Sequence, residues 1–377
     1  MTHQASPSIV IVGNSTQGLW IIRSSHNLNL KKIVLHDLHF CSSRYSKYID
    51  NYIKLPKGTI KNLADSHESK ILTENLLNLS VKFPSPLFGI NEDIINYFAF
   101  NKEILKEKYF IPDNKYHLIF DKYEFNKQSL DENQIQTLLL SDVVLEEYIG
   151  KNYILKSRRG NKLRNFTNEK AVLLRNYDGR YREILKNNFF VEELIIQKII
   201  KSSKPVTSVC SVSIDGKIFG LFQYEKLRQH PNQFGTGTYL KSSFNHGLKN
   251  LAEIILKKLH YTGISEIEFI YDDEDNKYKS IEMNPRTWKS IGFSTMCGQN
   301  LVEKYIKYII NQPFSRTLDY KTDQYWVDLF TDIPQMFREK KIFNYKSKNL
   351  FECTWDKKDP LPFLLSIFFA PLILLKV

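Results

Sequence analysis

The hydrophobic and polar positions near the start of the chain follow a β-α-β pattern. A β-branched run at 8–12, a glycine turn and an apolar-periodic helix at 16–26 precede a second buried strand at 31–37. Such a unit is typical of the start of an open parallel sheet. Gly13 and Gly18 have the spacing G-x-x-x-x-G instead of G-x-G-x-x-G, which favours a tight strand-to-helix turn over a dinucleotide site.

The pattern changes from about residue 90. A helical stretch at 91–109 ends before Pro112, and helical spacing at 247–261 predicts a helix with one buried face. The fold class predicted is an N-terminal parallel α/β unit followed by an antiparallel-rich α+β region. The strand-like segments of this second region are 189–200, 207–227 and 264–284, with "DG" at 215–216 and "EDN" at 274–276 as predicted hairpin turns.

A chain of 377 residues is long enough for more than one unit. We predict an N-terminal α/β domain at 1–90, a central subdomain at 91–188, a catalytic subdomain at 189–315 and a C-terminal extension at 316–377.

The composition is that of a soluble globular protein with a basic charge. Hydrophobic residues at 42% and charged residues at 25% argue against disorder and against a multi-span membrane protein. The net charge of +12 favours anionic partners such as nucleotides or phosphorylated metabolites. No aromatic-basic repeat supports nucleic-acid binding. The four cysteines form no C-x-x-C pair, which argues against a zinc site or disulfide scaffold, and we expect a cytoplasmic protein without a signal peptide.

Acidic side chains share one face of a predicted hairpin. Residues two apart in a strand point to the same side, so Glu266 lies beside Glu268, and Glu282 beside Asn284. A turn at 272–276 would bring Glu268 close to Glu282, and two such carboxylates repel unless a cation lies between them. Oxygen ligands favour Mg²⁺ over zinc. The alternative is a solvated strand face.

The segments "EIEF" and "IEMNPR" resemble the metal-binding hairpin of the ATP-grasp superfamily. The resemblance implies an ATP-grasp fold in which the N-terminal α/β unit is the pre-ATP-grasp domain. It also implies that Glu268, Glu282 and Asn284 hold two Mg²⁺ ions, or alternatively Mn²⁺, against the phosphates of ATP. Arg286 would then bind the acyl substrate.

Other segments resemble further parts of the ATP-binding site. The resemblance implies that Lys102 in "FNKEILKEK" contacts an ATP phosphate and that Lys156 in "YILKSRRG" lies on the β-phosphate side. The loop after Lys156 departs from the family, because it has the single glycine Gly160 and several basic residues, which predicts a clamp by charge. The segment "LIIQKII" resembles the adenine-binding hinge and implies roles for Ile196, Lys198 and Ile199.

The segment "KLRQHPNQFGTGT" resembles a carboxylate-amine ligase branch of the superfamily that includes D-aspartate ligases. It places Lys226 and Arg228 next to Gly235 and Gly237, a combination of cations and accessible backbone amides that suits an anion. The resemblance implies catalytic roles for both basic residues, with Arg228 and Arg286 stabilising an oxyanion.

The function implied is ATP-dependent ligation of a small carboxylate to a small amine. ATP would phosphorylate the carboxylate, the amine would attack the acyl phosphate to form an amide, and ADP and phosphate would be released. The alternative is a weak or inactive ATP-binding module, suggested by the single loop glycine and by Lys198 where the family often has glutamate.

The C-terminal tail is uncharged from Leu361 to Leu375, too short for a spanning helix and interrupted by Pro371. Two interpretations remain: a tail packed on the protein core, or peripheral contact of 360–377 with the inner face of the membrane. Membrane contact would favour an envelope or lipid-linked precursor as a substrate.

Overall fold

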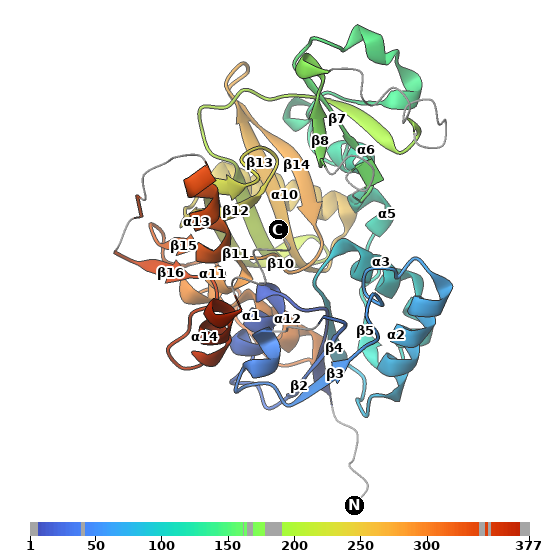
Figure 1. Ribbon diagram of the computed structural model, residues 1–377, viewed down its shortest axis with the longest axis vertical. Helices are drawn as coiled ribbons and strands as arrows, with labels where there is room; N and C mark the ends of the chain where they lie inside the picture. Colours follow the sequence, from blue (N-terminus) through green and yellow to red (C-terminus); the bar gives the residue numbers. More distant parts are fainter. Residues whose placement is uncertain are drawn as a thin grey trace, which may run out of the picture.

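The structure, a computed structural model, describes residues 7–38, 42–160, 162–163, 169–177, 191–338, 344–345 and 348–369. Three β-sheets are present in these ranges. Figure 1 shows the largest sheet in the centre, the N-terminal unit below it and a small sheet above it on the right. The C-terminal segment lies on the left side of the central sheet (Figure 1).

The N-terminal unit consists, in chain order, of β1 (Ser8–Val12), α1 (Thr16–Ser24), β2 (Lys31–His36), β3 (Asn51–Lys54), α2 (Ser66–Asn78), β4 (Ser85–Gly89), α3 (Glu92–Phe100), α4 (Lys102–Leu105) and β5 (Tyr109–Phe110). Its strands form a parallel sheet in the order β3-β2-β1-β4-β5, so the predicted β-α-β start is confirmed. Gly13 has φ +100, and a Cβ there would lie 2.4 Å from Ile90 Cγ1, so the turn into α1 requires glycine.

The first sheet extends beyond the predicted boundary at residue 90. After α3 and α4 the chain returns, and β5 pairs in parallel with β4. A boundary placed where the hydrophobic pattern changes therefore cuts this sheet, because the pattern cannot show that a strand of two residues comes back to it.

The small sheet is reached through two short helices, and its elements are α5 (Tyr116–Ile119), α6 (Lys122–Asn126), β6 (Thr137–Leu139), β7 (Tyr153–Ser157), β8 (Ala171–Leu173) and β9 (Leu194–Lys198). The strand order is β6-β9-β7-β8, and all pairs are antiparallel. Leu155, Val172 and Ile196 pack in an apolar cluster of this unit. Because β9 pairs with β6 and β7, it belongs to this sheet and not to the predicted catalytic subdomain at 189–315.

The central sheet carries most of the antiparallel strands, and this part of the chain contains β10 (Thr207–Ile214), β11 (Lys217–His230), β12 (Thr236–Ser242), α10 (His246–Leu259), β13 (Gly263–Asp272), β14 (Lys277–Asn284), α11 (Ile291–Met296) and α12 (Leu301–Ile309). The hairpin turns predicted between β10 and β11 and between β13 and β14 are confirmed. Helix α10 begins after the cap Asn245 and buries Leu248, Ile255 and Leu259.

The C-terminal segment continues the central sheet with β15 (Tyr325–Val327), α13 (Leu329–Arg338), β16 (Leu350–Glu352) and α14 (Leu361–Phe368). The sheet order is β14-β13-β10-β11-β12-β15-β16. This segment also contacts the N-terminal unit, because Trp20 Nε1 donates to the Cys353 carbonyl at 2.6 Å and Arg23 Nε lies 3.0 Å from Asp359 Oδ2. None of the helices in the described ranges is long and apolar enough to span a membrane.

Candidate active site

A cavity of about 880 Å³ lies where the small sheet, the central sheet and the N-terminal unit meet. The face of β13 and β14 that carries the carboxylates lines it, together with parts of β7, β9, β11 and β12. Three helices begin at its wall, and their first turns contribute Gln17 from α1, Glu92 from α3 and Lys122 from α6. The cavity is therefore built from segments far apart in the sequence.

The register of β13 and β14 brings the predicted carboxylates together. Glu268 is the cross-strand partner of Glu282, and Glu266 is the partner of Asn284. Directly opposed side chains in an antiparallel pair lie about 5 Å apart at Cβ. All four residues line the cavity, so the acidic face is directed into a site and is not an open solvated surface.

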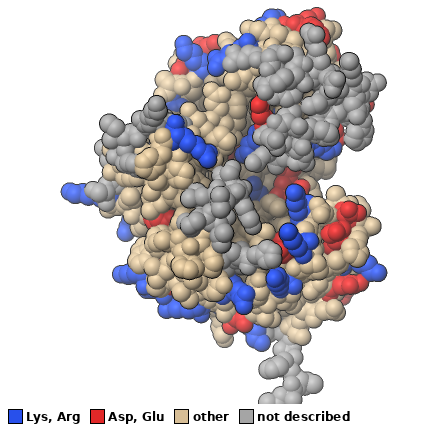
Figure 2. Space-filling model, in the orientation of Figure 1, with Lys and Arg blue, Asp and Glu red and all other residues tan. Residues whose placement is uncertain are grey.

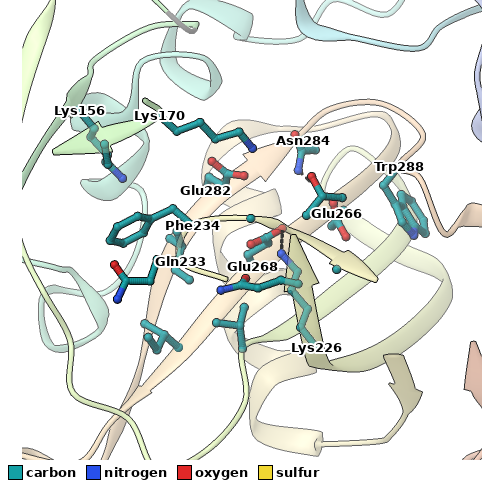
Figure 3. A pocket seen from close by; sticks show the side chains of 18 of the residues that line it. Lys156, Lys170, Lys226, Gln233, Phe234, Glu266, Glu268, Glu282, Asn284 and Trp288 are labelled. Carbon is teal, nitrogen blue, oxygen red and sulfur yellow. Dashed lines mark hydrogen bonds and ion pairs between the residues drawn. The ribbon is translucent and has the colours of Figure 1, made fainter. Parts of the chain in front are cut away.

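Hydrogen bonds hold the polar side chains of this hairpin face in place. Lys226 Nζ donates to Glu268 Oε1 at 2.5 Å, as the dashed line in Figure 3 shows. Glu266 accepts from the Tyr224 hydroxyl and from Asn284 Nδ2, the latter at 3.0 Å. Arg286 Nη2 donates to Asn284 Oδ1 at 3.0 Å. A continuous polar chain thus runs along the hairpin.

The two central carboxylates ionise differently. Burial, with the neighbouring charge of Glu282, raises the pKa of Glu268 to about 7 although Lys226 opposes this. Burial also disfavours ionisation of Glu282, but the ammonium groups of Lys122 and Lys156 outweigh it and hold its pKa below the usual value. The site thus contains one firmly charged carboxylate and one that is ionised only with difficulty.

Lysines face the carboxylates across the cavity. Lys156 on β7 lines it, and burial followed by repulsion from Lys122 lowers its pKa to about 8. Figure 3 shows Lys170 extending toward Glu282. Lys156 and Lys226 lie on different strands, Lys170 directly precedes β8 and Lys122 begins α6, so the fold gathers positive charge that a polyphosphate would neutralise.

The structure does not place Lys102 at the cavity. Its Nζ lies 3.1 Å from Asp113 Oδ1, and it is not among the cavity-lining residues. The lysine that begins a helix at the cavity wall is Lys122, the first residue of α6. Lys102 and Lys122 both begin a helix in the sequence, and only the path of the chain distinguishes them.

The basic loop after β7 has a different role from the clamp by charge that its sequence predicts. Arg158 Nε and Arg159 Nη2 each lie 2.7 Å from Asp121 Oδ2, and the Asp121 side chain is fully buried. Asp121 also accepts from two amide groups at the start of α6, so these arginines support the helix that presents Lys122. Gly160 does line the cavity, whereas Arg164 lies outside the described residues.

The predicted hinge reaches the cavity only in part. Lys198 and Ile199 line it, but Ile196 points into the apolar cluster of the small sheet. Lys198 Nζ lies 2.6 Å from Glu274 Oε2 in the β13–β14 turn. Gln197, which the sequence did not single out, also lines the cavity.

An irregularity within β11 separates Lys226 from Arg228. The strand register shifts between these two residues, and Arg228 is not a cavity-lining residue. Its Nη2 lies 2.6 Å from the buried Asp332 Oδ2 of α13. Arg228 is therefore positioned to hold the C-terminal segment, whereas Gly235 and Gly237 line the cavity with Phe234, which Figure 3 shows beside Gln233.

The donor set fits a hard divalent cation. Glu268, Glu282 and Asn284 supply oxygen atoms on one hairpin, and the raised pKa of Glu268 indicates that nearby lysines only partly compensate the paired carboxylates. These three residues would hold Mg²⁺, with water and phosphate oxygens completing its coordination.

The fold resembles that of solved enzymes. The N5-carboxyaminoimidazole synthetase of Staphylococcus aureus aligns with a TM-score of 0.63 and 17% identity over 90% of this chain and 86% of that chain. Residues 235–316, which include the whole carboxylate hairpin, match the family described as carbamoyl-phosphate synthase L chain, ATP binding domain. The chain has the ATP-grasp fold. The ATP-grasp fold predicted from the hairpin motif is thereby confirmed.

Two further matches are to ligases. D-aspartate ligase of Enterococcus faecium (strain Aus0004) is 23% identical over 302 residues, which span 76% of this chain and 65% of the relative. The alignment thus covers a little less than two thirds of that protein. The L-amino acid ligase of Bacillus licheniformis aligns with a TM-score of 0.58 and 14% identity over 81% of this chain and 74% of that chain.

Proposed function

We propose that the protein is an ATP-dependent carboxylate-amine ligase. This proposal rests on the opposed pair Glu268 and Glu282, which shares one cavity of about 880 Å³ with lysines from four other segments. A pair of carboxylates beside a cluster of lysines suits a magnesium-bound polyphosphate better than a neutral ligand. The similarity to D-aspartate ligase makes D-aspartate a first candidate for the acid.

The cavity residues divide into two proposed roles. Lys122 and Lys156 bind phosphate oxygens of ATP, and Mg²⁺ on the hairpin carboxylates would supply further charge neutralisation. Arg286, fixed by Asn284 and by the Thr287 carbonyl, binds the carboxylate that is phosphorylated and then stabilises the oxyanion formed when the amine attacks. The products are an amide, ADP and phosphate.

The test is release of ADP from purified protein with ATP and Mg²⁺. We expect release that requires both an acid and an amine from a panel of amino acids and primary amines. Glu282→Gln should abolish it, whereas Asp275→Asn, in the exposed turn of the same hairpin, should leave it within about twofold. ATP binding without turnover across the panel would instead favour an inactive ATP-binding module.

We also propose that the protein contacts the membrane surface through α14. Such contact would favour an envelope or lipid-linked precursor as substrate. Leu361, Leu364, Ile367 and Phe368 are between 47% and 76% exposed on this helix. Figure 2 shows an uncharged area around α14 with basic side chains along its lower edge. Apolar side chains bordered by lysines suit an anionic bilayer surface. Binding to anionic and zwitterionic lipid vesicles tests this proposal.

A further inference from the structure

We infer that Glu92 forms the subsite for the ammonium group of the amine substrate and accepts its proton. This inference rests on the proposed ligase function and adds the amine half of its site. Glu92 is the first residue of α3, so the N-terminal unit, and not the ATP-binding sheets, supplies the group.

Glu92 lines the active-site cavity together with Asn284 and Arg286 at the end of the carboxylate hairpin. A single side chain holds the two sides together: Gln17 Nε2 donates to the Ile90 carbonyl at 3.1 Å and to the Thr287 carbonyl at 3.2 Å. Ile90 is two residues before Glu92, and Thr287 directly follows Arg286. Glu92 is therefore kept close to the residue proposed to bind the acid.

Three charges act on the Glu92 carboxylate from across the cavity: those of Lys122, Glu282 and Arg286. In the proposed reaction these residues surround the phosphate, the metal and the acyl group, respectively. Glu92 is therefore within electrostatic range of the residues proposed to surround the acyl phosphate. Asp93, next in the chain, is the other acidic group that acts on it.

The Glu92 carboxylate is not committed to a structural contact. Among the described residues, none forms a hydrogen bond or an ion pair with it. Burial raises its pKa, Lys122 opposes this and Glu282 adds to it. A partly buried anion without a protein partner favours a cationic ligand, and the ammonium form of an amine is such a cation.

The chemistry of amide formation requires a group of this kind. An ammonium ion must lose one proton to a base before its nitrogen has a free electron pair, and Glu92 takes this proton. The nitrogen then forms a bond to the acyl carbon, the bond from that carbon to the phosphate oxygen breaks, and phosphate leaves with the electron pair. The second proton of the attacking nitrogen passes to the departing phosphate.

The alternative for Glu92 is a purely structural role at the start of α3. An acidic residue in the first turn of a helix stabilises the helix dipole, and both Glu92 and Asp93 occupy the first turn of α3. Asp93 is exposed and does not line the cavity, so Asp93→Asn is a matched control for the helix contribution.

The experiment compares two nucleophiles. Hydroxylamine is mostly uncharged at neutral pH and traps an acyl phosphate as a hydroxamate without an ammonium subsite. We measure hydroxamate formation with ATP, Mg²⁺, hydroxylamine and a panel of amino acids that includes D-aspartate, and amide formation with a panel of primary alkylamines and amino acid amides. Glu92→Gln should reduce amide formation by about 10²–10⁴-fold and leave hydroxamate formation within about threefold.

Each other result has a defined meaning. The inference would be overturned if Glu92→Gln reduced amide and hydroxamate formation equally, or reduced neither. It would also be overturned if Asp93→Asn had the same effect as Glu92→Gln. A wild-type protein that forms hydroxamate but accepts no protonated amine would also contradict an ammonium subsite. Failure of the wild type to form hydroxamate from any acid would instead refute the proposed ligase function. Thermal melting of each variant checks that it is folded.

Discussion

Arg228 and Asp332 form an ion pair that joins the central sheet to the C-terminal segment. Arg228 Nη2 lies 2.6 Å from Asp332 Oδ2, and the Asp332 side chain is fully buried. Thr238 and Tyr345 also donate to this carboxylate. The Arg228 guanidinium lies 4.2 Å from the ring centre of Tyr239, a cation-π distance. The residue proposed from sequence as catalytic is thus committed to a structural network.

Removing the arginine should lower stability. Arg228→Leu leaves a buried carboxylate without its charge partner, which costs about 3 kcal/mol in free energy of unfolding. Chemical denaturation measures this loss. Lys241→Gln, which breaks the more exposed pair of Lys241 and Asp323, should cost less than about 1 kcal/mol. If Arg228→Leu left stability unchanged but reduced ADP release, the catalytic role predicted for Arg228 from the sequence would be supported.

The two lysines that begin helices should behave differently. Lys122→Met removes a cation from the cavity, and loss of one charged hydrogen bond of about 1.5–3 kcal/mol corresponds to about 10–100-fold in kcat/KM for ATP. Lys102→Met should change this value less than twofold, because Lys102 pairs with Asp113 away from the cavity. Steady-state ADP release checks both variants, and the reverse ranking would restore the sequence-based assignment.

Stability without metal should depend on the ionisation of Glu268. Its pKa is raised to about 7, whereas a glutamate in an unfolded chain titrates near about 4.3. The folded protein therefore retains a proton that the unfolded chain releases, and this contribution to stability is lost as the pH rises from about 4.3 to 7. Relative to Glu268→Gln, the wild type should lose about 2–3 kcal/mol between pH 5 and 8 in denaturation experiments with chelator. A constant difference would contradict the raised pKa.

Metal affinity should also depend on the ionisation of Glu268, and it should rise with pH. A protonated Glu268 must release its proton to act as a ligand, so affinity for Mn²⁺, used as a spectroscopic substitute for Mg²⁺, should rise about fivefold from pH 6 to pH 7. Electron paramagnetic resonance of free Mn²⁺ gives the dissociation constant. The pH dependence should disappear in Glu268→Gln, and a pH-independent wild type would argue against Glu268 as a ligand.

The exposed face of α14 predicts binding to anionic vesicles. Phosphatidylglycerol vesicles should bind the protein, and phosphatidylcholine vesicles should bind it weakly, in a flotation assay. The double variant Leu364→Ser, Phe368→Ser should weaken binding at least about tenfold, because each exposed side chain loses apolar area for insertion. Val144→Ser, at a residue 56% exposed elsewhere on the surface, is the control. Equal binding of all variants would exclude α14 as the contact.

The hairpin could be predicted from sequence because its information is local. Alternation places Glu268 and Glu282 on one face of each strand, and the turn residues set the register within a few positions, so the cross-strand pairing is confirmed. The strands β7 and β9 and the helix α10 were also recognisable from local patterns. Hairpins and helices of this length carry their own periodicity.

The remaining site residues depend on tertiary contacts. The side chains of Lys226 and Arg228 have different surroundings because the strand register shifts at Leu227. The alternation of polar and apolar residues does not reveal such a shift. Glu92 reaches the cavity because the N-terminal unit packs against the hairpin through Gln17. A helix-initial glutamate has no distinctive sequence signal, since acidic residues are common in first turns.

The contacts of α1 have a consequence for folding during synthesis. Trp20 donates to the Cys353 carbonyl, and the buried guanidinium of Arg23 is satisfied by Asp359 and by the Thr354 carbonyl. While the chain emerges from the ribosome, the first helix has no partner for these groups until more than three hundred further residues have been translated. The N-terminal unit can therefore form its sheet early, but the side chains of Trp20 and Arg23 gain these partners only late in synthesis.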